Sequence, residues 1–211
     1  MSPDNTPSPE AARQRYDETA NRYDLTTRLL ARPRRQAFEA LGLRAGETVL
    51  DIACGTGLNL SALSRAVGSS GHVVGADISA GMLARAKARA TAEGLGNVEL
   101  LLGDVSKIEL PDADAALFSF THDVLRTPAA VRAVITSLRS SGRVAAAGVK
   151  YAHPAAIPIN LAVRAVAPRF ITTREGLRRP WSNLAEAAGP LKVESLLFGS
   201  LYVASGRVLR T

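Results

Sequence analysis

The stretch Val49-Leu50-Asp51-Ile52-Ala53-Cys54-Gly55-Thr56-Gly57-Leu58-Asn59-Leu60 decides the fold of this chain. It begins as an apolar strand with an acidic tip at Asp51, passes through a glycine turn and opens an amphipathic helix. Gly55 and Gly57 carry no Cβ and permit a positive φ, so the backbone N–H groups of the turn can approach a ligand closely. The stretch predicts a strand-turn-helix unit with a ligand at its turn.

Two further acidic residues follow predicted strands. The apolar run His72–Gly75 leads to Asp77, twenty residues beyond Gly57, which is about where a ribose-binding acid lies in a Rossmann-type unit. The run 98–102 leads through Gly103 to Asp104. Each acid alone is also what an ordinary cap or turn uses, but three acids at successive strand ends predict an adenosine-binding pocket.

Leu60 makes a bound pyrophosphate the weaker interpretation. Dinucleotide enzymes usually carry a third glycine three residues after the second, and here that position is Leu60. An NAD-dependent oxidoreductase therefore stays open only as an alternative from another class.

With these residues in place, the segment from about Tyr16 to Gly148 resembles the class I S-adenosylmethionine-dependent methyltransferases. That family usually carries acid-x-Gly-x-Gly-x-Gly after its first strand. This chain has Asp51 and the last two glycines, and Ala53 replaces the first glycine. The resemblance implies S-adenosyl-L-methionine as cofactor and S-adenosyl-L-homocysteine as product.

The resemblance also implies roles for individual residues. The glycine loop would pass beneath the methionine part of the cofactor, Asp51 would hold its ammonium group, Asp77 the ribose hydroxyls and Asp104 the adenine amino group. Ile78, Met82 and Val105 would cover the adenine ring, although Met82 is equally suited to the core. The full set of expected cofactor contacts is Tyr16, Tyr23, Asp51, Ala53, Gly55, Gly57, Asn59, Asp77, Ile78, Met82, Gly103, Asp104, Val105 and Phe120.

Length and composition favour one α/β domain. The chain has 211 residues, of which 46% are hydrophobic, and no apolar run approaches the roughly 20 residues of a membrane span. We expect a disordered tail over 1–9, a single domain over 10–211 and a cytoplasmic protein, because the opening residues lack the order of a signal peptide. Cys54 is the single cysteine, which excludes an intramolecular disulfide and a cysteine-based zinc site.

The formal charge of +7 raises the question of a nucleic-acid substrate. Methyltransferases acting on base amines generally carry Asp or Asn, two prolines and an aromatic residue after the fourth strand, and residues 119–123 lack that pattern. Aromatic residues are also too sparse for a stacking platform. We expect no nucleic-acid partner and no metal, and we expect a small-molecule acceptor; the oligomeric state is left open.

Alternating helix and strand signals predict a doubly wound, Rossmann-like, mostly parallel seven-stranded sheet with an antiparallel carboxyl-terminal strand. The expected strands are 47–52, 72–77, 98–102, 114–120 and 143–149, followed by a closing hairpin of 192–198 and 201–209. The expected helices are a cover within 10–43, then 57–67, 80–93 and 128–138.

Acceptor contacts are expected on loops beyond the carboxyl ends of the strands. Tyr16 and Tyr23 would share one face of a continuous helix and cover the site, in a pattern that resembles the ubiquinone/menaquinone-type branch of the family. His122, or alternatively His153, would act as a general base, and each could equally just shape the pocket. Tyr16 is a third candidate for a catalytic contact.

The segment 151–189 joins an apolar run to a cluster of arginines. It would form a lid over a hydrophobic acceptor, rest on an anionic membrane surface, or hold an anionic substrate group through Arg178 and Arg179. A core helix followed by a solvated basic turn is the simpler alternative.

The sequence thus predicts methyl transfer to an N or O atom of a partly apolar small molecule. Methylation of a phospholipid or betaine-lipid amine, and C-methylation, remain alternatives. A module that binds the cofactor without transferring methyl is the alternative from another class.

Overall fold

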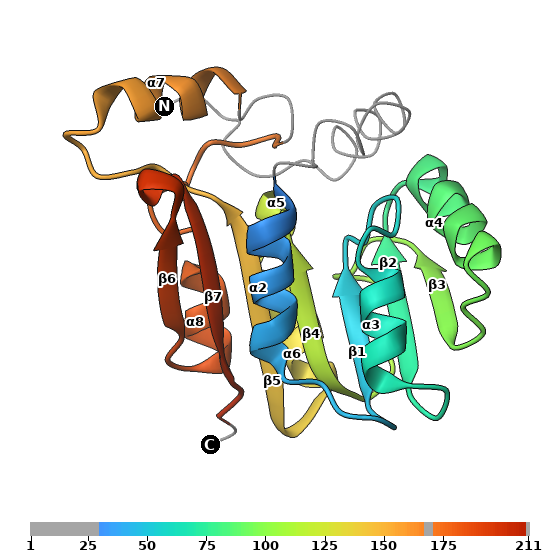
Figure 1. The fold of residues 1–211 in the computed structure, drawn as a ribbon. Coiled ribbons are helices and arrows are strands. Elements are labelled where there is room, and N and C mark those ends of the chain that lie inside the picture. Colours follow the sequence, from blue (N-terminus) through green and yellow to red (C-terminus); the bar gives the residue numbers. More distant parts are fainter. Residues whose placement is uncertain (1–29, 167–170, 210–211) are drawn as a thin grey trace.

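The computed structural model describes residues 30–166 and 171–209 (Figure 1). The expected tail over 1–9 and most of the helical cover, with Tyr16 and Tyr23, lie outside the described residues. The part of the cover that is described forms helix α2 (Ala31–Leu41), which ends two residues earlier than expected. Gly42 ends it because its φ of 55° lies in the left-handed region that commonly terminates helices.

Seven strands form one sheet in the order β3-β2-β1-β4-β5-β7-β6. The parallel strands are β1 (Thr48–Ile52), β2 (His72–Asp77), β3 (Val98–Leu102), β4 (Ala113–Ser119) and β5 (Leu138–Val149). β7 (Leu201–Arg207) pairs antiparallel with β5 and with β6 (Lys192–Leu196). The predicted fold class is confirmed.

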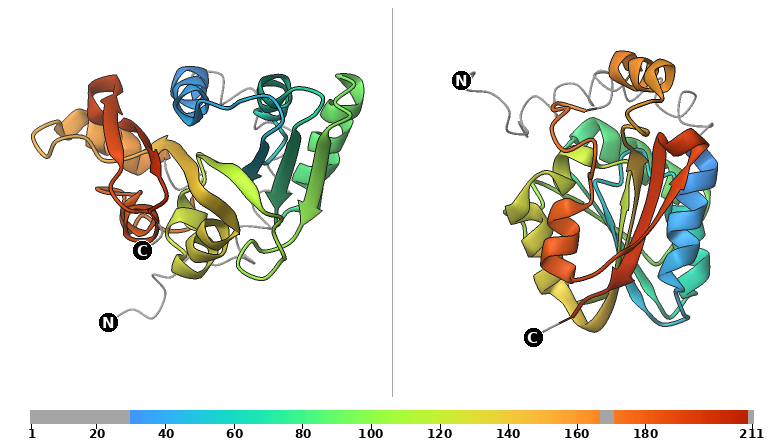
Figure 2. Two further views of the ribbon diagram at one scale, coloured as in Figure 1. Left: turned by 90° about the horizontal axis from the view of Figure 1, so that it is seen from below. Right: turned by 90° about the vertical axis from the view of Figure 1, so that its left-hand side faces the viewer.

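Helices cover both faces of the sheet (Figure 2). Apolar residues of α2, α3 (Leu60–Val67) and α4 (Ala80–Ala92) pack in one core with one face of the strands. Those of α5 (His122–Leu125), α6 (Pro128–Ser137) and α8 (Ser182–Ala188) pack in the core of the opposite face. The central strands are buried on both sides, which explains why they read as continuous apolar runs rather than alternating ones.

Several element boundaries differ from the sequence prediction. α3 starts at Leu60 rather than 57, because Gly57 has a φ of 78° and still belongs to the turn. β5 begins at Leu138 rather than 143, and the added residues include an irregularity in its pairing with β4. The closing hairpin is shorter than expected, since a 3-10 turn, η3 (Leu197–Gly199), joins β6 to β7.

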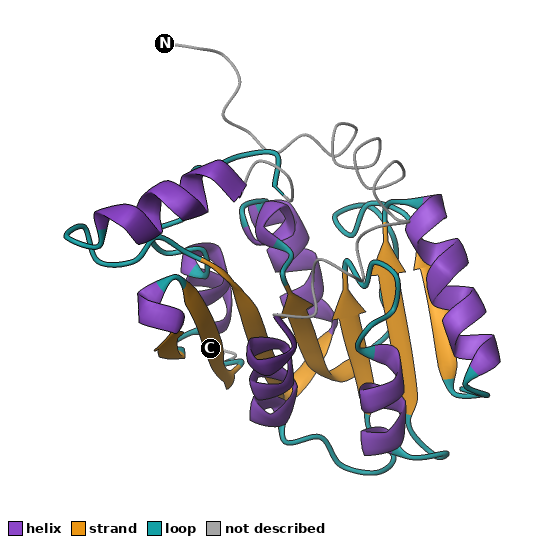
Figure 3. Cartoon of the chain, turned by 45° about the horizontal axis from the view of Figure 1, so that its top comes forward, coloured by secondary structure: helices purple, strands orange, loops and turns teal. Residues whose placement is uncertain are grey.

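The sheet order reverses between β1 and β4, and both strands end at the same edge. In open parallel sheets, the loops beyond the carboxyl ends at such a reversal form the ligand crevice. Figure 3 shows the loops after β1, β2 and β4 at this edge, with α7 (Ile157–Val166) lying beyond β5. The fold therefore brings the glycine turn, Asp77 and His122 to one end of the molecule.

Candidate cofactor and acceptor site

Asp77 fastens the glycine turn to the tip of the neighbouring strand. The backbone N–H of Gly55 donates to Oδ2 of Asp77 over 2.8 Å, and the N–H of Ser79 donates to Oδ1 over 2.9 Å. Ser79 in turn caps α4, because its hydroxyl accepts from the N–H of Met82. The carboxylate expected at the ribose thus also organises the turn beneath it.

Asp51 is fully buried at the end of β1, and Asn59 holds it. The Asn59 amide donates to both carboxylate oxygens, over 3.0 and 3.2 Å. Burial raises the pKa of Asp51 to about 7, while the Asn59 hydrogen bonds and the charge of Arg34 act in the opposite direction. A cationic group placed beside this carboxylate would favour its ionised form.

The turn between β1 and α3 has two glycines in different surroundings. Gly55 has a φ of 58°, and a Cβ added there would meet nothing within 4 Å. Gly57 has a φ of 78°, and its Cβ would lie 2.6 Å from Leu60 Cδ1 and 3.1 Å from Ala86 Cβ. Ala53 also has a positive φ, 51°, which explains why glycine is usual at its position in the resembled motif. Gly55 therefore faces open space and Gly57 faces the protein.

Asp104 makes its contacts inside its own turn. Its Oδ1 accepts hydrogen bonds from the Ser106 N–H and hydroxyl, and Oδ2 lies 3.7 Å from Lys107 Nζ. This is the turn role that the sequence left open, and an adenine amino group would have to share the same carboxylate. Gly103 precedes it with a φ of 154°.

The apolar residues expected around the adenine ring differ in exposure. Met82 and Val105 are 2% and 5% exposed and pack in the cores, so they offer little surface to a ligand. Ile78 is half-buried beside Asp77. Of these three residues, Ile78 has the most accessible side chain for a flat ring.

Phe120 and Arg34 meet at the end of β4. Phe120 has a φ of 61°, which is uncommon for an aromatic residue, and its backbone N–H donates to Ala147 O. The Arg34 guanidinium lies over the Phe120 ring at 5.6 Å from the centroid, in the range of a cation–π contact. Because Arg34 also acts electrostatically on Asp51, it links α2 to the predicted cofactor site.

His122 begins the short helix α5 instead of lying in a loop, and it is 8% exposed. Its Nε2 lies 3.0 Å from the carbonyl oxygen of Glu175, to which an Nε2–H would donate, and its buried Nδ1 has no hydrogen-bond partner. Burial lowers the pKa of the imidazole from its ordinary value of 6.5. A neutral ring with the proton on Nε2 leaves Nδ1 able to accept a proton.

His153 has different surroundings. It is exposed, and its Nδ1 accepts from the N–H of Ala155 over 3.3 Å, while its carbonyl accepts from the Asn160 amide. These contacts stabilise the turn before α7. Between the two predicted bases, His122 has the desolvated position.

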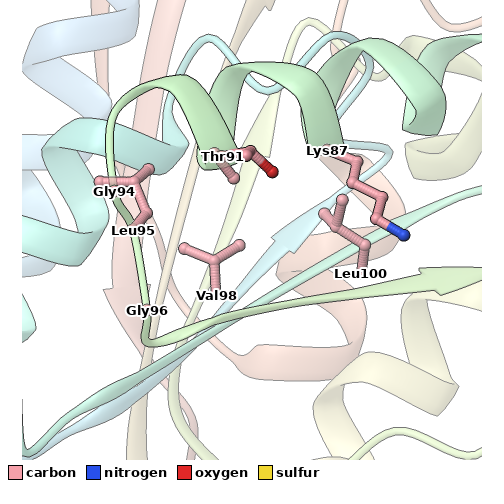
Figure 4. Close-up of a pocket in the computed structure, with 8 residues that line it drawn as sticks. Lys87, Thr91, Gly94, Leu95, Gly96, Val98 and Leu100 are labelled. Atoms are coloured by element: carbon pink, nitrogen blue, oxygen red, sulfur yellow. The ribbon is translucent and has the colours of Figure 1, made fainter.

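Among the described residues, two of the grooves lie beside the sheet. One, with a volume of about 630 Å³, runs between α2 and α3 and is lined by residues that include Arg32, Arg34, Phe38, Leu58 and Asn59. The other, of about 570 Å³, lies between α4 and the edge strand β3 (Figure 4) and is lined by residues that include Lys87, Thr91, Leu95, Val98 and Leu100. The α2–α3 groove reaches Asn59 and so adjoins Asp51, whereas the lining of the α4–β3 groove contains none of the predicted site residues.

Comparisons with known proteins agree with this geometry. A family model described as a methyltransferase domain matches residues 49–142. The ubiquinone/menaquinone biosynthesis C-methyltransferase UbiE of Ectopseudomonas oleovorans is 35% identical over 137 residues, covering 61% of this chain and 81% of that protein. The chain belongs to the class I S-adenosylmethionine-dependent methyltransferases.

The extent of the match to this methyltransferase family varies. UbiE of Pseudomonas putida strain F1 is also 35% identical, but this chain spans about half of it, 54%. A solved S-adenosylmethionine-dependent methyltransferase from Aquifex aeolicus has a TM-score of 0.66 at 22% identity, covering 92% of this chain and 98% of that chain, which shows the common fold.

The cofactor of this family is S-adenosylmethionine, and the residues of this methyltransferase suit it. The turn brings together two buried carboxylates, Asp51 and Asp77, and a glycine, Gly55, that leaves its backbone open to a ligand. Within the described residues, no cluster of histidine, cysteine or acidic side chains is suited to hold a metal ion. Nor does any helix in the described ranges have the length and hydrophobicity to cross a membrane.

Sequence reasoning missed several residues of the site. It gave no role to Arg34, to the Glu175 carbonyl that contacts His122, or to Asp123, whose carboxylate accepts from the Thr172 N–H. No local sequence signal marks these residues, because each contact joins elements far apart in the chain.

Proposed function

We propose that this methyltransferase transfers a methyl group from S-adenosylmethionine to a partly apolar small molecule. The observation that carries the proposal is the arrangement at the end of β1. Asp51 is a buried carboxylate at the end of this strand, a second carboxylate, Asp77, holds the turn that follows, and Gly55 leaves the turn open to a ligand. This arrangement offers one carboxylate to an ammonium group and a second as hydrogen-bond acceptor to ribose hydroxyls, and S-adenosylmethionine carries both kinds of group.

The proposed cofactor contacts follow the predicted roles. Asp51, oriented by Asn59, binds the ammonium group, and Asp77 binds the ribose while keeping the Gly55 N–H. Ile78 covers the adenine ring, and Asp104 accepts from its amino group. Tyr16 and Tyr23 remain proposed cover residues.

The chain must then align the acceptor and exclude water, because the sulfonium already supplies a good leaving group. Holding acceptor and donor in line contributes about 7–11 kcal/mol to lowering the barrier. His122, kept neutral by burial, takes a proton from the acceptor at Nδ1 while its Nε2–H is held by Glu175. We propose that the segment 151–189 closes over the acceptor, since the Glu175 carbonyl in this segment contacts His122.

The methylated atom is proposed to be N or O, for which a neutral base at Nδ1 is useful. Carbon is the second candidate, and the observation that favours it is the name of the 35% identical relatives, which are C-methyltransferases. An acceptor with an electron-rich ring and a hydroxyl group is compatible with both O-methylation and C-methylation. Removing the hydroxyl proton activates the oxygen and the adjacent ring carbon alike. A lipid amine is a further acceptor that an apolar, basic 151–189 segment would accommodate.

The first test is calorimetric titration with S-adenosylhomocysteine, with NAD and NADP on the same sample as controls. We expect binding of S-adenosylhomocysteine alone. A response to a nicotinamide cofactor instead would contradict the proposal and support an oxidoreductase.

The second test incubates the protein with methyl-labelled S-adenosylmethionine and three probes: an alkyl catechol, an alkyl hydroquinone and a long-chain primary amine. Nuclear magnetic resonance of the product distinguishes a methyl group on O, N or C by its chemical shift. Binding of cofactor without labelled product from any probe would favour a cofactor-binding module over a transferase.

A further inference from the structure

Exposed apolar side chains gather at one end of the molecule. Among the described residues, six large apolar side chains are more than half exposed, and four of them come from α7 and η3. These four, which we call the apolar tip, are Ile157 (63%), Leu161 (60%), Leu197 (63%) and Phe198 (83%). Contiguous exposed apolar surface of this kind marks an interaction site in a soluble fold.

The two halves of the apolar tip are joined by backbone contacts. Lys150 N donates to Ser200 O, just after η3, and Gly199 packs on Ala152. Ala152 N donates to the Asn160 side chain of α7. Figures 1 and 2 show α7 and the β6–β7 turn at the same end of the molecule, opposite the carboxyl terminus. The tip is therefore one surface rather than two unrelated loops.

The backbone conformation at η3 is unfavourable for the residue types that occupy it. Leu197 and Phe198 have φ values of 45° and 54°, in the left-handed region where a non-glycine residue carries a conformational cost. Neither side chain is buried in the core, so packing does not offset this cost. Glycine or asparagine would suit the turn better, which indicates that these apolar groups serve a contact outside the fold.

Helix α7 presents a matching stripe. Ile157 and Leu161 are four residues apart and so lie on one face, while Val163 is buried on another. Arg164, exposed and three residues after Leu161, borders the stripe. An amphipathic helix with arginine beside its apolar face is suited to lie in a membrane interface.

The charge around the apolar tip is mostly positive. Backbone Tyr151 N donates to Leu177 O, which brings the arginine-containing turn to the segment before α7. Within 150–166 and 171–181, Glu175 is the sole acidic residue, and it lies 3.8 Å from Arg126. The cations of the same ranges are Lys150, Arg164, Arg174, Arg178 and Arg179, of which the four arginines are exposed.

We propose that the apolar tip docks this protein on the surface of an anionic lipid bilayer, with Leu197, Phe198, Ile157 and Leu161 in the interface and the arginines on the lipid head groups. Basic residues near an anionic leaflet add to the attraction of inserted apolar groups. The tip lies at the end where the parallel strands terminate, so the site would face the bilayer. The proposal goes beyond methyl transfer and does not depend on the acceptor.

The test is sedimentation of the full chain with vesicles of phosphatidylcholine alone and of phosphatidylcholine with 30% phosphatidylglycerol, a composition on the order of natural anionic surfaces. We expect binding to the anionic vesicles that weakens as salt rises. The double variant Leu197→Ser/Phe198→Ser should bind at least about tenfold more weakly. Leu209→Ser, equally exposed at 63% but at the opposite end, is the matched control and should bind like the wild type.

Arg178→Gln/Arg179→Gln should reduce binding to anionic vesicles by roughly tenfold, with Arg85→Gln on α4 as the control. In Phe198→Trp, the emission of the added tryptophan, read as the difference from wild type, should shift to shorter wavelength with anionic vesicles.

Absence of vesicle binding by the wild type would overturn the proposal, as would equal loss in the Leu209 control. Sedimentation velocity on the same variants tests whether the apolar tip binds a second copy of the chain instead of a bilayer. A dimer that Leu197→Ser/Phe198→Ser abolishes, without vesicle binding, would assign the apolar tip to a second copy of the chain. Thermal unfolding of each variant confirms that the folded state is being compared.

Discussion

The carboxylate of Asp77 accepts the backbone N–H of Gly55 over 2.8 Å, across 22 positions of the chain. This bond ties the tip of β2 to the glycine turn after β1. It fixes the position of the turn, and it places an anionic group where the ribose is proposed to bind. One residue therefore supports both the shape and the chemistry of the site.

Replacing Asp77 should weaken both the fold and cofactor binding, because its carboxylate also holds the Gly55 and Ser79 N–H groups. Asp77→Ala removes hydrogen bonds to a charged acceptor, each worth about 1.5–3 kcal/mol, so we expect the Kd for S-adenosylhomocysteine to rise at least about tenfold. Calorimetry measures this, and Asp112→Ala, exposed in the loop before β4, is the control. An unchanged Kd would remove Asp77 from the site.

The two glycines of the turn should respond differently to alanine. Gly57→Ala places a Cβ against Leu60 and Ala86 and should cost roughly 2–4 kcal/mol of unfolding free energy. Gly55→Ala meets no protein atom within 4 Å and should cost only about 1–2 kcal/mol, but it should weaken S-adenosylhomocysteine binding by about tenfold or more.

Denaturant unfolding and calorimetry on the same pair provide the check. If Gly55→Ala binds the ligand as tightly as the wild type, the cofactor does not pass over this turn.

Asp51 should make stability and binding depend on pH in opposite directions. Its folded pKa of about 7 lies above the unfolded value near 4, so the folded state holds the extra proton and loses stability as pH rises from about 4 to about 7. We expect Asp51→Asn to flatten this slope and to stabilise the ligand-free protein at pH 8 by a few kcal/mol.

Binding should rise with pH in the same window, because the ammonium group of the ligand needs the ionised carboxylate. Asp51→Asn should bind S-adenosylhomocysteine weakly at every pH. A pH-independent wild-type affinity between pH 5.5 and 8 would speak against this contact.

His122 should be needed for turnover rather than for cofactor binding. His122→Gln keeps an amide N–H for the Glu175 carbonyl but lacks the basic Nδ1, so we expect kcat to fall about 100-fold or more with an unchanged Kd for S-adenosylhomocysteine. The wild-type rate should fall as pH drops through the lowered pKa, which lies below 6.5.

The probe assay with labelled S-adenosylmethionine measures kcat and its pH dependence, and calorimetry measures the Kd for S-adenosylhomocysteine. Full activity of His122→Gln would leave this histidine a packing role, and His153→Gln serves as the comparison for the exposed imidazole.

Much of the fold followed from local chemistry. Apolar runs bounded by glycine and acidic residues predicted the parallel strands, because a strand that is buried on both faces is apolar along its whole length. Element ends were harder to predict: Gly57 extends a turn that the apolar pattern assigned to helix, and β5 continues across an irregular pairing. The sequence pattern predicts a loop at His122, but His122 begins helix α5 in the structure.

The sequence by itself determined the order of the strands along the chain, the glycine turn and the three acids, since these depend on periodicity and residue spacing along the chain. Only the tertiary structure decided which groups meet: Arg34 with Phe120, Asn59 with Asp51, the Glu175 carbonyl with His122, and the apolar tip from two distant segments. The physical reason is that burial, desolvation and hydrogen bonding depend on distances in space, and residues far apart in the chain set those distances when the sheet forms.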